Sequence, residues 1–211
     1  MTTYYRCSGI QSSGGGSEVK ELVEGTLTSL TTDATKVKKY AFYNDTALTS
    51  FIGHNVTQLD DYAFRSTYSL ATLELGNLTV VNSNALYGAG ATGSYFDITL
   101  NGAAGGEAFR NSKIRKALGS ISSINTGVFR ECTNLIEAWW GGSNIGNQVF
   151  YGCTALADLY LLNTSGVVTL SNANALTNVP TTCKVHVPSS LLASYQADTT
   201  WSAFDLVAIT E

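Results

Sequence analysis

Glu137 and Asp158 are the two acidic residues best spaced for acid–base chemistry. Each of them opens a short apolar segment, Ala138-Trp139-Trp140 and Leu159-Tyr160-Leu161. If these segments are neighbouring strands, the two carboxylates lie roughly 5 Å apart, a separation that suits a retaining glycosidase. An acidic pair on an exposed sheet is more often solvated surface, and no deep cleft is predicted, so we assign no catalytic residue and expect a non-enzyme.

Two other candidate chemical sites fail for lack of context. The motif Gly88-x-Gly90-x-x-Gly93 follows an apolar stretch and precedes Glu107 by a spacing typical of dinucleotide sites. No alternation of strands and helices surrounds it, so no cofactor site is predicted. The two histidines, His54 and His186, have no second ligand at convincing spacing, so no metal site is predicted either. His186 is interpreted as the outward residue of an alternating strand.

Composition narrows the class of protein further. The chain has 211 residues and a net charge of −4, which disfavours binding to nucleic acid. No apolar run is long enough to cross a bilayer, and Met1-Thr2-Thr3-Tyr4-Tyr5-Arg6 does not resemble a secretory leader. We therefore expect a soluble protein made without a signal peptide, with neither membrane nor nucleic acid among its partners.

A repeated phrase of the Ala-Phe type organises most of the chain. Its large apolar residue, the anchor, recurs at intervals of 20 to 23 residues, with a weaker seventh copy at Leu176. The six clear anchors are Phe42, Phe64, Leu86, Phe109, Phe129 and Phe150. Two further apolar clusters follow each anchor, so a unit has three inward clusters and cannot close a core alone. Stacked units bury a continuous core, and the sequence therefore predicts a solenoid.

The position three residues after the anchor is always small, and in two neighbouring units it is Cys132 and Cys153. Stacking brings these two cysteines next to each other. A disulfide between them is possible, but two packed thiols are the favoured interpretation.

The pattern Ala-Phe-x-x-Cys-x-x-Leu-x-x-Leu resembles the BspA-type leucine-rich repeat of bacterial, protist and phage proteins. Residues 149–159 follow it closely, and the resemblance extends over roughly residues 26 to 211. It implies a leucine-rich-repeat solenoid, mainly β with short turns and helical pieces, closed by a small C-terminal cap. Residues 183–188 resemble the last strand of that family, and residues 191–204 resemble its short helical closure.

We divide the chain into a flexible N-terminal arm and linker at 1–17, a repeat array with its N-terminal cap at 18–179, and a C-terminal capping strand and short helix at 180–211. Glycines at 88–93 and 102–106 replace the expected turn and apolar pair of the third unit. A bend, a loop or local mobility is expected there.

Strand alternation then predicts which side chains face out. One residue after the inward positions stand Ile52, Glu74, Trp139 and Tyr160, with Leu118 and either Phe96 or Thr99 from the intervening units. Glu137 and Asp158 also point outward, and Ile136 adds apolar area. Exposed aromatic rings beside carboxylates are a common way to bind a sugar or a protein. Alternatively, Trp139 packs under a neighbouring loop, while Trp140 lies in the core. The predicted ligand-binding residues are Trp139, Tyr160, Glu137, Asp158, Ile136 and Phe96.

The resemblance implies an adhesion or receptor-binding module, expected in a phage or prophage virion, that binds a cell-surface glycan or protein. A bacterial cell-surface adhesin and a structural virion subunit, such as a decoration, collar or tail component, are the alternatives. In the last case the sheet contacts neighbouring subunits, and a homo-oligomer is left open.

Overall fold

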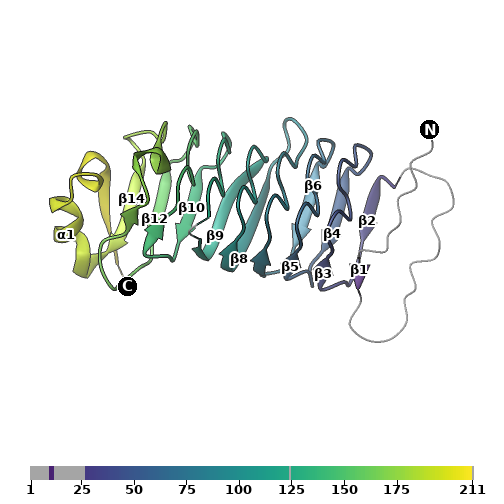
Figure 1. Ribbon diagram of the computed structural model, residues 1–211, viewed down its shortest axis with the longest axis horizontal. Coiled ribbons are helices and arrows are strands. Elements are labelled where there is room, and N and C mark those ends of the chain that lie inside the picture. Colours follow the sequence, from purple (N-terminus) through teal and green to yellow (C-terminus); the bar gives the residue numbers. More distant parts are fainter. Residues whose placement is uncertain (1–9, 12–26, 124, 211) are drawn as a thin grey trace.

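The computed structural model describes residues 10–11, 27–123 and 125–210 and shows an elongated solenoid whose strands stack in chain order (Figure 1). The proposed flexible arm at 1–17 and the start of the array lie almost wholly outside these residues. The strands before the middle of the chain are β1 (Ile10–Gln11), β2 (Ser29–Thr31), β3 (Lys36–Val37), β4 (Ser50–Gly53), β5 (Gln58–Leu59), β6 (Thr72–Leu75) and β7 (Leu78–Val81). Those that follow are β8 (Phe96–Ala104), β9 (Ile114–Ser122), β10 (Glu137–Trp140), β11 (Asn144–Ile145), β12 (Asp158–Leu161), β13 (Thr169–Leu170), β14 (Lys184–Pro188) and β15 (Asp205–Ile209).

The anchor side chains form one row through the core, as predicted. The rings of Phe42 and Phe64 stack with centroids 5.0 Å apart. Phe129 stacks on Phe109 at 5.1 Å and on Phe150 at 5.6 Å. Leu86 is fully buried between the two groups of rings and continues the row. Each unit thus buries its anchor against the units before and after it, which is the stabilising interaction of a solenoid.

The turns that carry the anchors are joined by backbone hydrogen bonds from unit to unit. Phe42 N donates to Ala63 O at 2.8 Å, and Phe64 N donates to Ala85 O at 2.7 Å. The residues two before and two after each anchor have positive φ, for example Gly127 at 67° and Glu131 at 61° around Phe129. Left-handed residues at both ends of the phrase turn the chain sharply, so the anchor points inward while the flanking N–H groups point along the stack.

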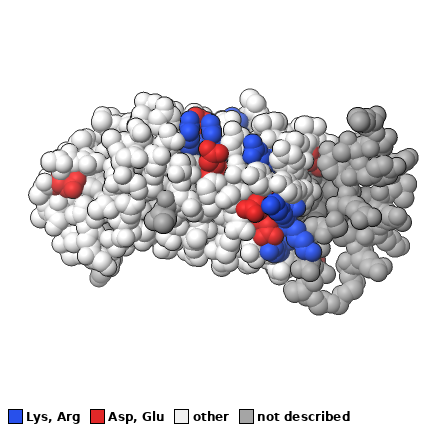
Figure 2. All heavy atoms as spheres, in the orientation of Figure 1, with Lys and Arg blue, Asp and Glu red and all other residues white. Residues whose placement is uncertain are grey.

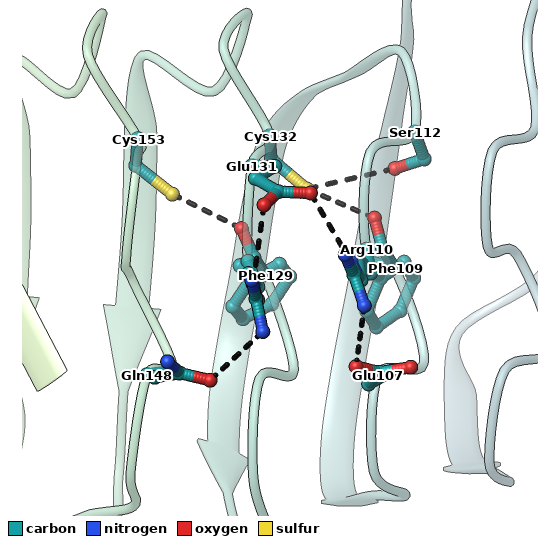
Figure 3. A network of polar contacts seen from close by, with 10 residues as sticks. Glu107, Phe109, Arg110, Ser112, Phe129, Glu131, Cys132, Gln148 and Cys153 are labelled. Carbon is teal, nitrogen blue, oxygen red and sulfur yellow. Dashed lines mark hydrogen bonds and ion pairs between the residues drawn. The ribbon is translucent and has the colours of Figure 1, made fainter. Parts of the chain in front are cut away.

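Cys132 and Cys153 are free, buried thiols, in agreement with the favoured interpretation. Each thiol donates to the carbonyl of the anchor in the preceding unit: Cys132 Sγ lies 2.9 Å from Phe109 O, and Cys153 Sγ lies 3.1 Å from Phe129 O (Figure 3). The small residue at this position is therefore explained by a bond between units as well as by space. Cys7 lies outside the described residues.

Two sets of strands run along the solenoid. The first, on what we call the outer face, comprises β2, β4 and β6, the N-terminal parts of β8 and β9, and then β10, β12, β14 and β15. The second comprises β3, β5 and β7, which also join β8, and the separate pair β11 and β13. Except for the antiparallel pair of β1 and β3, neighbours in these sheets are parallel.

The third unit departs from the pattern in a different way from the one predicted. Glycines at 88–93 do form a loop, with positive φ at Gly88, Gly90 and Gly93. The second glycine segment is only partly irregular, because residues 102–104 form the end of β8, one of the two longest strands. Gly102 is required there, since a Cβ would lie 2.1 Å from Thr79 O on β7.

The C-terminal cap contains the predicted strand, β14, and the predicted helix, α1 (Leu192–Ala197). The short 3-10 helices are η1 (Ala173–Leu176), η2 (Ser189–Leu191) and η3 (Trp201–Ala203). The cap adds a strand that was not predicted, β15, which pairs in parallel with β14. Tyr195 and Trp201 are buried and bond to the N–H and the carbonyl of Val168 at 2.9 and 2.7 Å. None of the helices within the described part of the chain has the length and apolar character needed to span a bilayer.

Candidate functional site

The predicted face is formed where β10, β12 and β14 run side by side. In β10, Ala138 and Trp140 are buried while Glu137 and Trp139 face outward, because successive side chains of a strand alternate. The register pairs Trp139 with Tyr160 and Tyr160 with His186. We call these three side chains the aromatic row.

The rings of the aromatic row stack on one another. The centroids of Tyr160 and His186 are 4.0 Å apart with planes 5° from parallel, and those of Trp139 and Tyr160 are 5.1 Å apart with planes tilted by 39°. Both faces of the Tyr160 ring are thus covered by its neighbours. Tyr160 therefore presents its ring edge and its hydroxyl to solvent rather than a flat face.

Charged residues hold the aromatic row in place. Glu137 accepts hydrogen bonds from Lys116 Nζ at 2.6 Å and from Trp139 Nε1 at 2.9 Å. His186 Nε2 lies 2.8 Å from Asp158 Oδ1, and since a carboxylate can only accept, the imidazole donates. Both predicted carboxylates are therefore fixed by neighbouring side chains, and Trp139 is oriented by Glu137 of its own strand.

The hydroxyl of Tyr160 stays protonated over a wider pH range than an ordinary phenol. Partial burial raises its pKa, and the nearby negative charges of Asp158 and Glu137 raise it further. The group is thus available to a partner as a hydrogen-bond donor, and within the described residues it has no bond of its own.

The two other predicted ligand-binding residues, Ile136 and Phe96, differ in their exposure to solvent. Ile136 is exposed, with 38% of its surface accessible, and lies next to Glu137. The prediction that Phe96 faces outward is wrong: it is only 6% exposed, because β8 begins with its inward residue. The outward position of that strand belongs to Thr99, which pairs with Leu118 on β9. Ile52 and Glu74 lie on β4 and β6, away from the aromatic row.

His186 and Lys116 are the residues of this site that the sequence interpretation missed. His186 was expected to face out, and it does, but its place in the row depends on pairing two segments that lie 26 residues apart. The sequence signal is the likeness of Val185-His186-Val187 to Leu159-Tyr160-Leu161. Lys116 follows from the register alone, which sets it opposite Glu137.

The polar groups of the site are largely bonded to one another. Both Glu137 oxygens are already occupied, so neither is free to protonate a leaving group. No cluster of three or more His, Cys, Asp or Glu side chains that could hold a metal ion occurs in residues 27–123 and 125–210. The glycine motif at 88–93 leads into strand β8 and not into a helix, so it lacks the element that would bind a phosphate.

Comparison with known families agrees with this geometry. The model for the BspA type leucine rich repeat region matches six copies in residues 25–136 and 94–169, which together cover more than half of the chain. The protein belongs to the BspA-type leucine-rich repeat family. This family provides a binding scaffold. In this BspA-type protein the scaffold consists of the stacked anchors and of the turns that backbone hydrogen bonds join from unit to unit. No curated protein matches the chain in sequence.

Charge on this BspA-type solenoid is sparse and paired. Figure 2 shows one side of the molecule, where blue and red side chains gather in a few groups of mixed sign and most of the surface is uncharged. On this side of the molecule, opposite charges lie close together and largely cancel at a distance.

Proposed function

We propose that this protein is an adhesion or receptor-binding module of a phage or prophage virion, and that it binds a protein on the cell surface through the aromatic row. The observation that carries the choice of ligand is the stacking of Tyr160 between Trp139 and His186. A sugar binds best against the flat face of an aromatic ring, and the faces of Tyr160 are covered. Ring edges beside carboxylates suit the mixed apolar and polar contacts of a protein interface.

The composition of the site supports the same choice. Tryptophan and tyrosine are enriched among the residues that dominate protein interfaces, and pre-ordered side chains lose little entropy on binding. Trp139 is held by Glu137, and Tyr160 is held by its two ring neighbours. Ile136 extends the apolar area at the entry to β10. The virion setting rests on the resemblance to phage members of the family.

The test is binding of the fluorescently labelled full chain to a panel of bacterial cells. We expect binding to at least one strain, lost when the cells are treated with proteinase K and kept when their glycans are oxidised with periodate. The Trp139→Ala and Tyr160→Ala variants should each weaken binding about 10-fold or more, the usual effect of removing a central interface aromatic.

A matched control is Tyr68→Ala, which removes an exposed tyrosine in the turn before β6, away from the sheet. It should bind like the unaltered protein. Equal binding by the Tyr160→Ala variant would contradict the proposed site, and binding lost to periodate alone would contradict the choice of a protein ligand. Detection of the chain by mass spectrometry in virions induced from a strain that carries the gene tests the setting.

A further inference from the structure

The ladder of strands on the outer face is broken at one place. Every other pair of neighbouring strands described on this face is hydrogen-bonded, but β6 and β8 are not. The glycine-rich loop at 88–95 comes directly before β8 and bonds to the preceding unit, where Gly90 N donates to Thr67 O and Ala91 N donates to Leu70 O. Both strands carry their labels in Figure 1.

The break leaves a backbone acceptor unpaired. In the preceding unit, Thr49 O accepts from the N–H groups of Ala71 and Thr72 at 2.8 and 3.0 Å. The equivalent carbonyl one unit later is Ala71 O, and within the described residues it accepts no backbone bond. The nearest candidate donors turn elsewhere, since Ser94 N donates to Ala91 O and Phe96 N to Lys113 O.

A shallow cleft of about 500 Å³, broadly open to solvent, lies between the two strands. The residues that line it include His54, Thr72, Glu74, Tyr95 and Asp97, and the unpaired carbonyl of Ala71 belongs to the same lining.

Each wall of the cleft carries a donor and an acceptor that are paired with each other. On the β6 side, His54 Nε2 lies 2.8 Å from Glu74 Oε2. On the β8 side, Arg115 donates to Asp97 through Nε at 3.1 Å and through Nη2 at 2.7 Å. Each carboxylate is already paired with a basic side chain, so a simple ion would find no unpaired opposite charge to bind. A hydroxyl both donates and accepts, so neighbouring hydroxyls on one ring can bond to such pairs without separating them.

Tyr95 offers an uncovered ring face, which Tyr160 in the aromatic row does not. It is 51% exposed and lines the cleft. In the described part of the protein no other aromatic ring stacks on it, in contrast to Tyr160. Its ring can therefore pack against the C–H face of a sugar.

We propose that the cleft between β6 and β8 is a saccharide-binding site, in which Tyr95 packs on a pyranose ring while Glu74, Asp97 and Ala71 O accept hydrogen bonds from its hydroxyls. This site is separate from the aromatic row and does not depend on the function proposed for that row.

The test is saturation-transfer NMR of the full chain with D-glucose, D-galactose, D-mannose, L-rhamnose and N-acetylglucosamine, each at about 10 mM, a concentration that detects millimolar affinity. We expect at least one sugar to receive signal on its ring protons. Tyr95→Ala should weaken that sugar's binding about 10-fold, and Glu74→Gln and Asp97→Asn should also weaken it, whereas Tyr95→Phe should retain it.

Tyr43→Ala is the matched control, because it removes an exposed tyrosine that does not line the cleft and lies outside the aromatic row, and it should leave sugar binding unchanged. All the altered side chains are at least partly exposed, so the variants should fold, which circular dichroism checks. No signal from any of the five sugars, or equal loss in the Tyr43→Ala and Tyr95→Ala variants, would overturn the proposal.

Discussion

The imidazole of His186 lies face to face with the phenol ring of Tyr160, with centroids 4.0 Å apart and planes 5° from parallel. The two residues come from the last repeat strand and from the cap, so the cap continues the binding face as well as closing the core. The same contact turns the edge of Tyr160 toward solvent.

Tyr160→Ala should lower the free energy of unfolding by about 1 to 3 kcal/mol, since it removes two ring contacts that contribute about 0.5 to 1.5 kcal/mol each. Urea unfolding measures the loss. Trp140 and Trp201 are buried, whereas Trp139 loses its ring neighbour, so the native emission should shift to longer wavelength. Unchanged emission and stability would show that the stack is not formed in solution. The Tyr68→Ala variant, altered at an exposed site, is the control.

Phe129→Ala should cost about 3 to 5 kcal/mol, the usual penalty for deleting a buried phenylalanine. Phe129 is fully buried and stacks on Phe109 and Phe150, so the cavity opens between three units at once. Chemical denaturation followed by circular dichroism measures the change. A loss below about 1 kcal/mol would contradict a continuous core, because surface substitutions stay within about 0.5 kcal/mol.

Gly152→Ala should destabilise the protein by about 1 kcal/mol or more, although the added Cβ would meet no atom closer than 3.5 Å. The reason is the backbone conformation, since Gly152 has a φ of 75°, where a side chain is strained. Gly166→Ala is the matched control, because nothing lies within 4 Å of its Cβ and its φ is not positive. Thermal melting of the two variants should separate them, and equal melting temperatures would refute the strain argument.

The thiols of Cys132 and Cys153 should not react with a disulfide reagent at pH 8 until the protein unfolds. Burial raises the pKa of Cys132 from 9.0 to about 12 and that of Cys153 well above its ordinary value, so almost no thiolate is present. The measurement is reaction with Ellman's reagent, with and without denaturant, in a background in which Cys7 and Cys183 are both replaced by serine. Rapid reaction of either thiol in the folded protein would contradict its packed position.

The same shift predicts how stability depends on alkaline pH. The unfolded chain loses its Cys132 proton near pH 9, whereas the folded chain keeps it up to about pH 12. The unfolded state therefore binds fewer protons in this window, and the free energy of unfolding falls as pH rises from about 9 toward 12. Urea unfolding at several pH values should show a shallower decline for Cys132→Ala than for the unaltered protein. An equal slope would mean that Cys132 does not contribute.

In the cap and in the third unit, the sequence predicted some elements correctly and others not. Residues 183–188 were expected to form a strand and residues 191–204 a short helical closure, and these segments contain β14 and α1. Asp205–Ile209 was missed as a strand because a single short apolar segment carries no repeat signal. At 102–106 the glycines predicted irregularity, whereas part of that segment is strand, because Gly102 lets β8 approach Thr79 closely.

The sequence by itself determined the repeat, the inward row of anchors and the outward positions of Glu137, Trp139, Asp158 and Tyr160. Each of these follows from a period or from alternation along one strand, which are local properties of the chain. Only the tertiary structure decided that Phe96 is buried, that His186 and Lys116 join the face, and that β6 and β8 do not pair. These outcomes depend on register between segments more than fifteen residues apart, and register is set by packing across units rather than by any one segment.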